Sequence, residues 1–315
     1  MSKRDVAWRT GTGSRAPAGS ERVALAGTWV AAITALVSGV SVFVNSYGVH
    51  AVAPPAAYTT AKNFMAALFL GVAIVAAAGL RRTRRGSAAH RFLDRPVTGR
   101  ADGSDRGRAR LARWLGLGYV GVVGGGVAFI LFFDGLADTT PTPAAFLHDG
   151  LVVWVGFLAL PLLRERLHVW NFLAIALLMG GQVAVLGGVG QLTANRGDLL
   201  VLGATWLWAV EVVVCKRLLA DLAPATVSLT RMGVGAALLF VYLAATGSLS
   251  VLGSLTLPQV GWVTVTGLLL AGYVGTWMTA LSRARAVDVT AVLVGSTVIT
   301  SLLSAMAGTL PVAPA

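Results

Sequence analysis

The feature of this sequence that most restricts its fold is a series of long apolar blocks. A helix needs about 20 consecutive apolar residues to cross a bilayer. Nine blocks meet or approach that length: 23–45, 57–80, 114–136, 143–163, 168–188, 197–215, 225–246, 260–281 and 288–310. Only 12% of the residues are charged, against about 25% in soluble domains, which leaves too little polar surface to cover a water-soluble fold. The sequence therefore predicts an all-α integral membrane protein with nine transmembrane helices.

The basic residues lie mainly on one side of the predicted membrane. Most of the 25 lysines and arginines fall in the tail 1–22, in the segment 81–113, and directly after the fourth, sixth and eighth spans, whereas the opposite loops hold only Arg196. Cytoplasmic loops carry an excess of Lys and Arg, so this pattern predicts a multi-pass protein of the plasma or inner membrane with a cytoplasmic N-terminus. The tail and the segment 81–113 lack an apolar period, and we expect both to be disordered.

The net charge of +12 does not indicate a nucleic-acid partner, because the basic residues sit between apolar blocks, where membrane topology places them. The lipid bilayer is the expected partner instead. A single cysteine, Cys215, excludes an intrachain disulfide, and no Cys/His set has the spacing of metal ligands. We therefore expect neither a metal nor a cofactor.

Two parts of the chain repeat the same pattern. Pro55 is followed by six residues and then Lys62, and Pro224 is followed by six residues and then Arg231. Two further stretches align between the halves: 38–41 with 208–211, and 145–147 with 291–293. The sequence thus predicts a first repeat over 23–188, with five spans and the loop 81–113, and a second repeat over 197–310, with four.

An odd number of spans in the first repeat makes the second repeat enter the membrane from the opposite side. The halves then form an inverted-topology repeat, an architecture from which many secondary transporters are built, with the solute site near the midplane between the repeats.

On these residues the chain resembles the EamA branch of the drug/metabolite transporter superfamily. The resemblance is carried by the proline-to-basic spacing, the stretch from Trp208 to Arg217, and the turn 163–167 (Leu-Arg-Glu-Arg-Leu), which is similar to a Gly-Glu-Arg-Leu turn of the family. It implies ten helices with both ends cytoplasmic, and transport, often export, of amino acids or other small metabolites. It also implies that the last helix of each half is peripheral and tied to dimer contacts, so a homodimer is expected.

The chain departs from that family pattern after its ninth span. Residues 308–315 read Gly-Thr-Leu-Pro-Val-Ala-Pro-Ala, and Pro311 stands where Glu165 stands in the first half. We expect the tenth helix to be missing, which would put the C-terminus outside; a truncated or frameshifted reading frame is one explanation that the sequence leaves open.

Ionisable residues inside membrane spans are costly and usually face a bundle interior or a cavity. Depth along the spans sorts those of this chain into two layers. The outer layer holds Lys62, Asp134, His148 and Asp149, and the inner layer holds Glu211 and Arg231. We expect an ion-pair gate at each end of a central cavity, with Lys62, Arg231 and Asp134 as gate residues. The alternative is structural: Lys62 and Arg231 snorkel to headgroups and pin the helix ends.

Four residues are the candidates for the solute pathway: Asp149, Glu211, Trp208 and His148. Trp208 and Glu211 are three residues apart and share one helix face. The neighbouring pair His148 and Asp149 allows proton transfer. Binding of a metal ion by the same pair is not expected, because adjacent helix residues diverge by about 100° and do not chelate one ion together. The glycine run 121–126 lacks the Lys-Ser/Thr of a phosphate loop, and its Gly121 and Gly125 predict close helix packing.

The function that these observations favour is transport of a small organic solute, driven by an ion gradient or by the solute gradient, since no nucleotide-binding motif is present. Two alternatives remain. The missing tenth helix is compatible with a degenerate, non-transporting paralogue. A membrane-embedded enzyme is the other class, but the chain contains neither His-Glu-x-x-His nor Gly-x-Ser-x-Gly, so we expect no enzyme.

Overall fold

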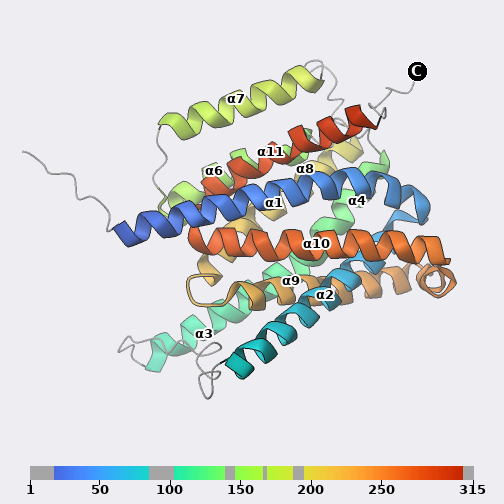
Figure 1. Ribbon diagram of the computed structural model, residues 1–315, viewed down its shortest axis with the longest axis horizontal. Helices are drawn as coiled ribbons and strands as arrows, with labels where there is room; N and C mark the ends of the chain where they lie inside the picture. Colours follow the sequence, from blue (N-terminus) through green and yellow to red (C-terminus); the bar gives the residue numbers. More distant parts are fainter. Residues whose placement is uncertain (1–17, 85–102, 139–145, 166–168, 187–194, 308–315) are drawn as a thin grey trace, which may run out of the picture.

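The computed structural model describes residues 18–84, 103–138, 146–165, 169–186 and 195–307. These residues form helices and turns, without a strand among them, as the apolar blocks predict. Figure 1 shows the helices packed lengthwise into one bundle, with α1 running alongside α10 and α11. The all-α membrane fold is therefore confirmed.

The first half of the bundle comprises seven labelled elements. They are α1 (Ala18–Ala51), α2 (Pro55–Arg84), α3 (Gly103–Gly118), the π-helix η2 (Tyr119–Val127), α4 (Ala128–Asp138), α6 (Leu151–Leu162) and α7 (Val169–Leu186). The elements α3, η2 and α4 follow one another without a break and form one long helical segment.

The second half has five elements, which are α8 (Arg196–Leu218), α9 (Pro224–Ala245), the 3-10 helix η4 (Leu249–Ser254), α10 (Leu257–Arg283) and α11 (Ala286–Met306). Local sequence explains where several of these helices begin. Proline stands in the first turn of α2, α9 and α10, where its missing N–H would have no helical partner. The Asn195 side chain accepts a hydrogen bond from the Asp198 N–H at 2.8 Å and caps α8.

Every predicted span contains helix in the described residues, but the number nine is not confirmed. Six helical stretches are long and apolar enough to cross a membrane: Leu25–Ala51, Pro55–Leu80, Gly107–Gly135, Arg196–Leu218, Pro224–Ala245 and Leu257–Arg283. Two shorter apolar stretches, Phe146–Leu162 and Ala286–Thr300, accompany them. The predicted lack of a tenth helix concerns residues 308–315, which lie outside the described ranges.

Two segments predicted to be disordered are partly helical. The helix α1 begins at Ala18, inside the predicted tail 1–22, and the segment 81–113 contains the end of α2 and, from Gly103, the start of α3. Arginine, alanine and leucine are strong helix formers even where no apolar period exists, and a preformed membrane helix adds one hydrogen bond for each residue by which it is extended. The rest of both segments, 1–17 and 85–102, lies outside the described residues.

The packing of the helices follows the two-fold pattern of an inverted repeat. In this pattern α1 corresponds to α8, α2 to α9, the α3–η2–α4 segment to α10, and α6 to α11. With this correspondence, every major contact between helices has a counterpart. The contact of α1 with α10 matches that of α8 with α4, α1 with α11 matches α8 with α6, and α2 with α10 matches α9 with η2. The helices α2 and α9 pack against each other across the axis, and the cations that they carry, Lys62 and Arg231, are both buried.

The helix α7 stands apart from this arrangement. It lies at the edge of the bundle next to α11 (Figure 1), and its Phe172, Leu173 and Leu177 are exposed. A peripheral last helix of the first half is what the family resemblance implies.

Candidate functional site

The helix α8 carries the centre of the candidate site. Trp208 and Glu211 are both buried on it, which agrees with their three-residue spacing. Trp208 Nε1 donates a hydrogen bond to the Gly124 carbonyl at 3.0 Å, and the Tyr119 hydroxyl donates one to the Leu207 carbonyl at 3.1 Å. These bonds fix α8 of the second repeat against η2 of the first.

A buried ion pair joins α8 to α9. Arg231 Nε lies 2.6 Å from Glu211 Oε1, and Arg231 Nη2 lies 3.2 Å from Oε2. Only 10% of the arginine side chain and 5% of the glutamate side chain are exposed. This fork-like geometry is the strong form of a charge-assisted hydrogen bond. The two residues that it joins are those predicted from the sequence to share the inner layer.

The glycines of η2 make room for this ion pair. A Cβ at Gly124 would collide with the Glu211 carboxylate, and one at Gly125 would collide with the Arg231 carbonyl oxygen. Gly235 on α9 lies directly against Gly125. The prediction that this glycine run serves close helix packing is confirmed, and the stretch is also a π-helix, a form found frequently at functional sites.

An aromatic cluster borders the ion pair. The rings of His148 and Trp208 have centroids 5.1 Å apart, and Phe132 lies 5.4 Å from each of them. Phe129 contacts Trp208 at 5.3 Å and lies 5.6 Å from the Arg231 guanidinium carbon, a cation–π distance. The structure thus brings together four of the predicted residues: Trp208, His148, Glu211 and Arg231.

His148 has a feature that the cluster does not explain. Its Nδ1 is buried and has no hydrogen-bond partner among the described residues, although buried polar atoms are nearly always paired. Asp149 follows it, half-buried. The roles of both residues in a solute pathway stay predictions.

The predicted outer ion-pair layer is not formed. Lys62 Nζ donates to Asn45 Oδ1 at 3.1 Å, and neither Asp134 nor Asp149 is its partner in the described part of the chain. Asp134 is exposed on α4. It follows Phe133, whose ring lies 5.6 Å from Lys62 Nζ, but adjacent helix residues point about 100° apart, so a matching depth does not bring the carboxylate to the ammonium group. A gating role for Lys62 and Asp134 stays a prediction, without an ion pair between them.

A cavity of about 240 Å³ lies beside α4 at the end of the bundle where α2 begins and α9 ends. Its lining residues come from the start of α2, from the first two turns of α4 and from the end of α9 with the residues that follow it: Pro54, Pro55, Ala56, Phe129, Ile130, Phe133, Asp134, Tyr242, Thr246 and Ser248. Phe129 also contacts Arg231, and Phe133 also contacts Lys62 at 5.6 Å. Two aromatic side chains therefore link this cavity to the two buried cations.

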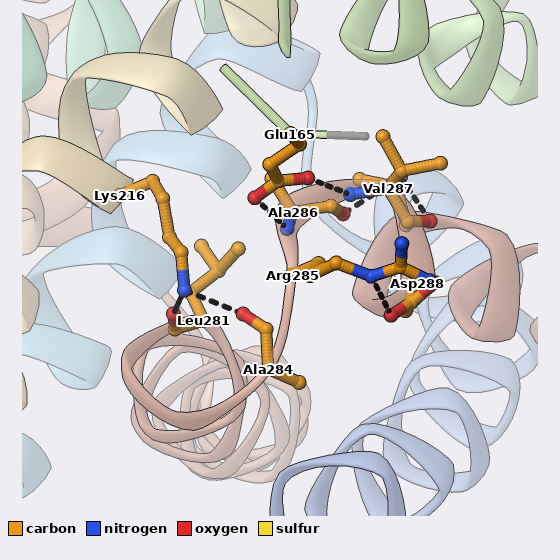
Figure 2. Close-up of polar contacts among 9 residues, drawn as sticks. Glu165, Lys216, Leu281, Ala284, Arg285, Ala286, Val287 and Asp288 are labelled. Atoms are coloured by element: carbon orange, nitrogen blue, oxygen red, sulfur yellow. Dashed lines mark hydrogen bonds and ion pairs between the residues drawn. The ribbon is translucent and has the colours of Figure 1, made fainter. Parts of the chain in front are cut away.

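The opposite end of the bundle is held by a second group of contacts, which we call the inner clasp: Glu165, Lys216 and the segment from Leu281 to Val287 (Figure 2). Glu165 accepts hydrogen bonds from the Ala286 N–H at 2.9 Å and the Val287 N–H at 3.4 Å. Lys216 donates to the Leu281 carbonyl at 2.7 Å and the Ala284 carbonyl at 2.5 Å.

Each charge of the inner clasp matches the helix end that it meets. The carboxylate caps the N-terminus of α11, and the ammonium caps the C-terminus of α10, the ends at which the helix dipole favours those signs. The sequence singles out Glu165 and Lys216 only as part of a family resemblance. The available signal was the position of both charges directly after an apolar span.

We predict that Glu165→Gln increases the reactivity of Cys215, the chain's single cysteine, which is buried next to Lys216. Alkylation by N-ethylmaleimide in membranes should become about tenfold faster, because each hydrogen bond to a charged group contributes roughly 1.5–3 kcal/mol to keeping the end closed. Asp221→Asn is the control, since its exposed pair with Arg113 lies outside the clasp. An unchanged alkylation rate in Glu165→Gln would show that the clasp does not hold this end closed.

The described ranges bring together no group of three or more His, Cys, Asp and Glu side chains that could hold a metal ion. The chemistry that the site offers is binding: a fixed ion pair, an aromatic surface and a few unpaired polar atoms.

Comparison with known proteins agrees with this architecture. A family model described as the EamA-like transporter family matches residues 98–187 and 195–308, one match in each predicted repeat. An uncharacterized transporter of Methanothermobacter thermautotrophicus is 32% identical over 97 residues, which are 29% of this chain and 28% of that relative.

A solved crystal structure is similar in fold, with a TM-score of 0.62 and 18% identity over 93% of this chain and 91% of the other. The two family matches together cover more than half of the residues. The chain therefore belongs to the EamA-like transporter family.

Proposed function

We propose that this protein is a secondary transporter that moves a small organic solute across the cell membrane by alternating access between its two repeats. The observation that carries the proposal is the Glu211–Arg231 pair, which is buried in the membrane where α8 and α9 of the second repeat meet η2 of the first. Intramembrane ionisable residues of this kind usually mark solute or ion pathways. Inverted repeats place the solute site at the interface between the halves.

The proposed roles follow from position. Glu211 and Arg231 form the inner gate, and Trp208 and His148 line the solute path, with Asp149 beside them. The inner clasp is made while the 240 Å³ cavity lies at the opposite end, so the arrangement corresponds to a state closed at the clasp end. The direction is export, with the N-terminus in the cytoplasm. An ion gradient or the solute gradient drives it, without a cofactor or an enzymatic step, and the assembly is a homodimer.

The test compares small metabolites outside cells that overexpress the wild-type chain, Glu211→Gln or Asp221→Asn at equal membrane levels. Asp221 is a matched control because it also pairs with an arginine, at 2.9 Å, but at an exposed site. We expect at least one compound to be enriched outside cells carrying the wild type or Asp221→Asn, and not outside cells carrying Glu211→Gln. Equal profiles for all three proteins and the empty vector would contradict export, and equal activity of Glu211→Gln would remove the pair from the pathway.

A further inference from the structure

Lys62 is a buried cation for which the described residues provide no counter-charge. Lys62 is only 6% exposed, and its Nζ makes one hydrogen bond among the described residues, to Asn45 Oδ1 at 3.1 Å. An ammonium group has three N–H donors. Burying a charge without a partner is very unfavourable, so a group that stays charged here needs an anion from elsewhere.

The counterpart of Lys62 in the second repeat shows what is missing. Lys62 and Arg231 each stand seven residues after the proline that begins their helix. The backbone carbonyl of each cation lies close to a glycine of the opposite half: Gly267 is near the Lys62 carbonyl, and Gly125 packs against the Arg231 carbonyl. The two cations are thus placed alike, but only Arg231 has a carboxylate partner among the described residues.

The surroundings hold the Lys62 ammonium group in a fixed position. Asn45 Oδ1 also accepts a hydrogen bond from the Tyr58 hydroxyl at 2.7 Å, and Asn45 Nδ2 donates to the Ser41 carbonyl at 2.7 Å, so the acceptor itself is oriented. The Nζ atom lies 5.1 Å from the centroid of the Tyr58 ring and 5.6 Å from that of Phe133. Aromatic rings at these distances stabilise a cation, but they do not neutralise it, and two N–H groups remain available.

One aromatic side chain lies both against Lys62 and on the cavity. Phe133 contacts Lys62 and also lines the 240 Å³ cavity, so a change in the rotamer of this ring would connect the two. Next to Lys62, the side chain of Asn63 is unexposed, and neither its amide oxygen nor its amide nitrogen has a partner among the described residues. Buried side-chain polar atoms are nearly always paired, and this amide lies on the same turn of α2 as Lys62.

We propose that Lys62 binds the carboxylate of an anionic solute, which enters from the cavity past Phe133. The proposal rests on the transport function and adds its substrate class: the solute supplies in the first repeat the carboxylate that Glu211 supplies in the second. Asn45 and Tyr58 are positioning residues for the ammonium group, and Asn63 offers hydrogen bonds to a second polar group of the solute.

The direct test uses the fact that the chain has three lysines, Lys3, Lys62 and Lys216. The full-length chain is labelled with ¹³C at the lysine Cε, placed in phosphatidylcholine nanodiscs and titrated with sodium butyrate or with butyramide, a neutral probe of the same shape. Butyrate should shift the Lys62 signal saturably, butyramide should not, and the Lys216 signal should stay in place. Lys62→Gln assigns the signal. No shift with butyrate, or an equal shift with butyramide, would overturn the proposal.

A second lipid composition separates a solute from a headgroup. If discs of anionic phosphatidylglycerol already produce the butyrate shift and abolish the response to butyrate, the anion is a lipid and the solute site is wrong. If the response to butyrate persists, the site binds soluble carboxylates as proposed.

The export assay keeps this proposal distinct from the transport function. Lys62→Gln should lower export about tenfold or more, because the loss of one partner of a buried charge pair weakens binding strongly. The variant Lys216→Gln, which lacks the other described lysine, is the matched control in the titration. In this variant the Lys62 signal should still respond to butyrate. If the wild type binds butyrate but exports no compound, transport alone is contradicted. If the wild type shows no butyrate shift and export persists in Lys62→Gln, the Lys62 site alone is contradicted.

Discussion

Replacing Arg231 with methionine is expected to lower the free energy of unfolding by about 3–5 kcal/mol. The Glu211 carboxylate would keep its buried position, with 5% of its side chain exposed, and would lose both hydrogen bonds of 2.6 and 3.2 Å. The double variant Arg231→Met/Glu211→Met removes both charges, and replacing a whole buried pair with hydrophobic residues of similar volume is often neutral or stabilising. We therefore expect the double variant to recover most of the stability, as measured by denaturant unfolding in detergent micelles.

The control is the exposed pair of Arg113 and Asp221, whose side chains are 36% and 50% exposed. Arg113→Met should change stability by less than about 1 kcal/mol, because water compensates both charges. A single Arg231→Met as stable as the wild type would show that the pair does not hold α8 to α9. The recovered double variant should remain inactive in the export assay, which would separate the role of the pair in transport from its role in stability.

Gly125→Ala is expected to be the most disruptive alanine substitution in the glycine run, with a loss of about 3 kcal/mol. The new Cβ would overlap the backbone oxygen of Arg231, and backbone cannot rotate away as a flexible side chain can. Gly124→Ala would press on the Glu211 carboxylate and Gly235→Ala on the backbone of Gly125. All three variants should unfold at lower denaturant concentration and lose export, because each pushes η2 away from α8 or α9.

Two other glycines on the same helices provide matched controls. At Gly118, directly before η2, and at Gly233 on α9, an added Cβ would have no neighbouring atom within 4 Å. Their alanine variants should be stabilised by about 0.5–1 kcal/mol, because alanine loses less backbone entropy in a helix than glycine does. Equal behaviour of Gly118→Ala and Gly125→Ala would contradict the close approach of η2 and α9.

The sequence was informative wherever a property depends on local order along the chain. Apolar runs located the helices, such as 225–246 against the observed Pro224–Ala245 and 197–215 against Arg196–Leu218, because a span must match the thickness of the bilayer. The proline-to-basic repeat implied the two-fold packing that the helices show. Depth along the spans was sufficient to place Glu211 with Arg231, since few positions in a membrane tolerate charge.

The same reasoning was insufficient where helix rotation and neighbours decide the outcome. Depth placed Lys62 beside Asp134 and Asp149, but the rotation of α2 turns the ammonium group to Asn45 on α1 and to the rings of Tyr58 and Phe133. The contacts of Glu165 with Ala286 and Val287 join residues 121 and 122 positions apart in the chain. A local pattern does not contain such distances.

The sequence by itself thus determined the membrane environment, the helical class, the repeat and the family, because each follows from composition and from short spacing patterns that can be compared along the chain. Only the tertiary structure decided which helix ends Glu165 and Lys216 cap, that the glycine run receives the Glu211 carboxylate, and that Lys62 has no carboxylate partner among the described residues. The physical reason is that pairing depends on which faces of non-adjacent helices meet, and side-chain packing between helices sets those faces at the scale of single atoms.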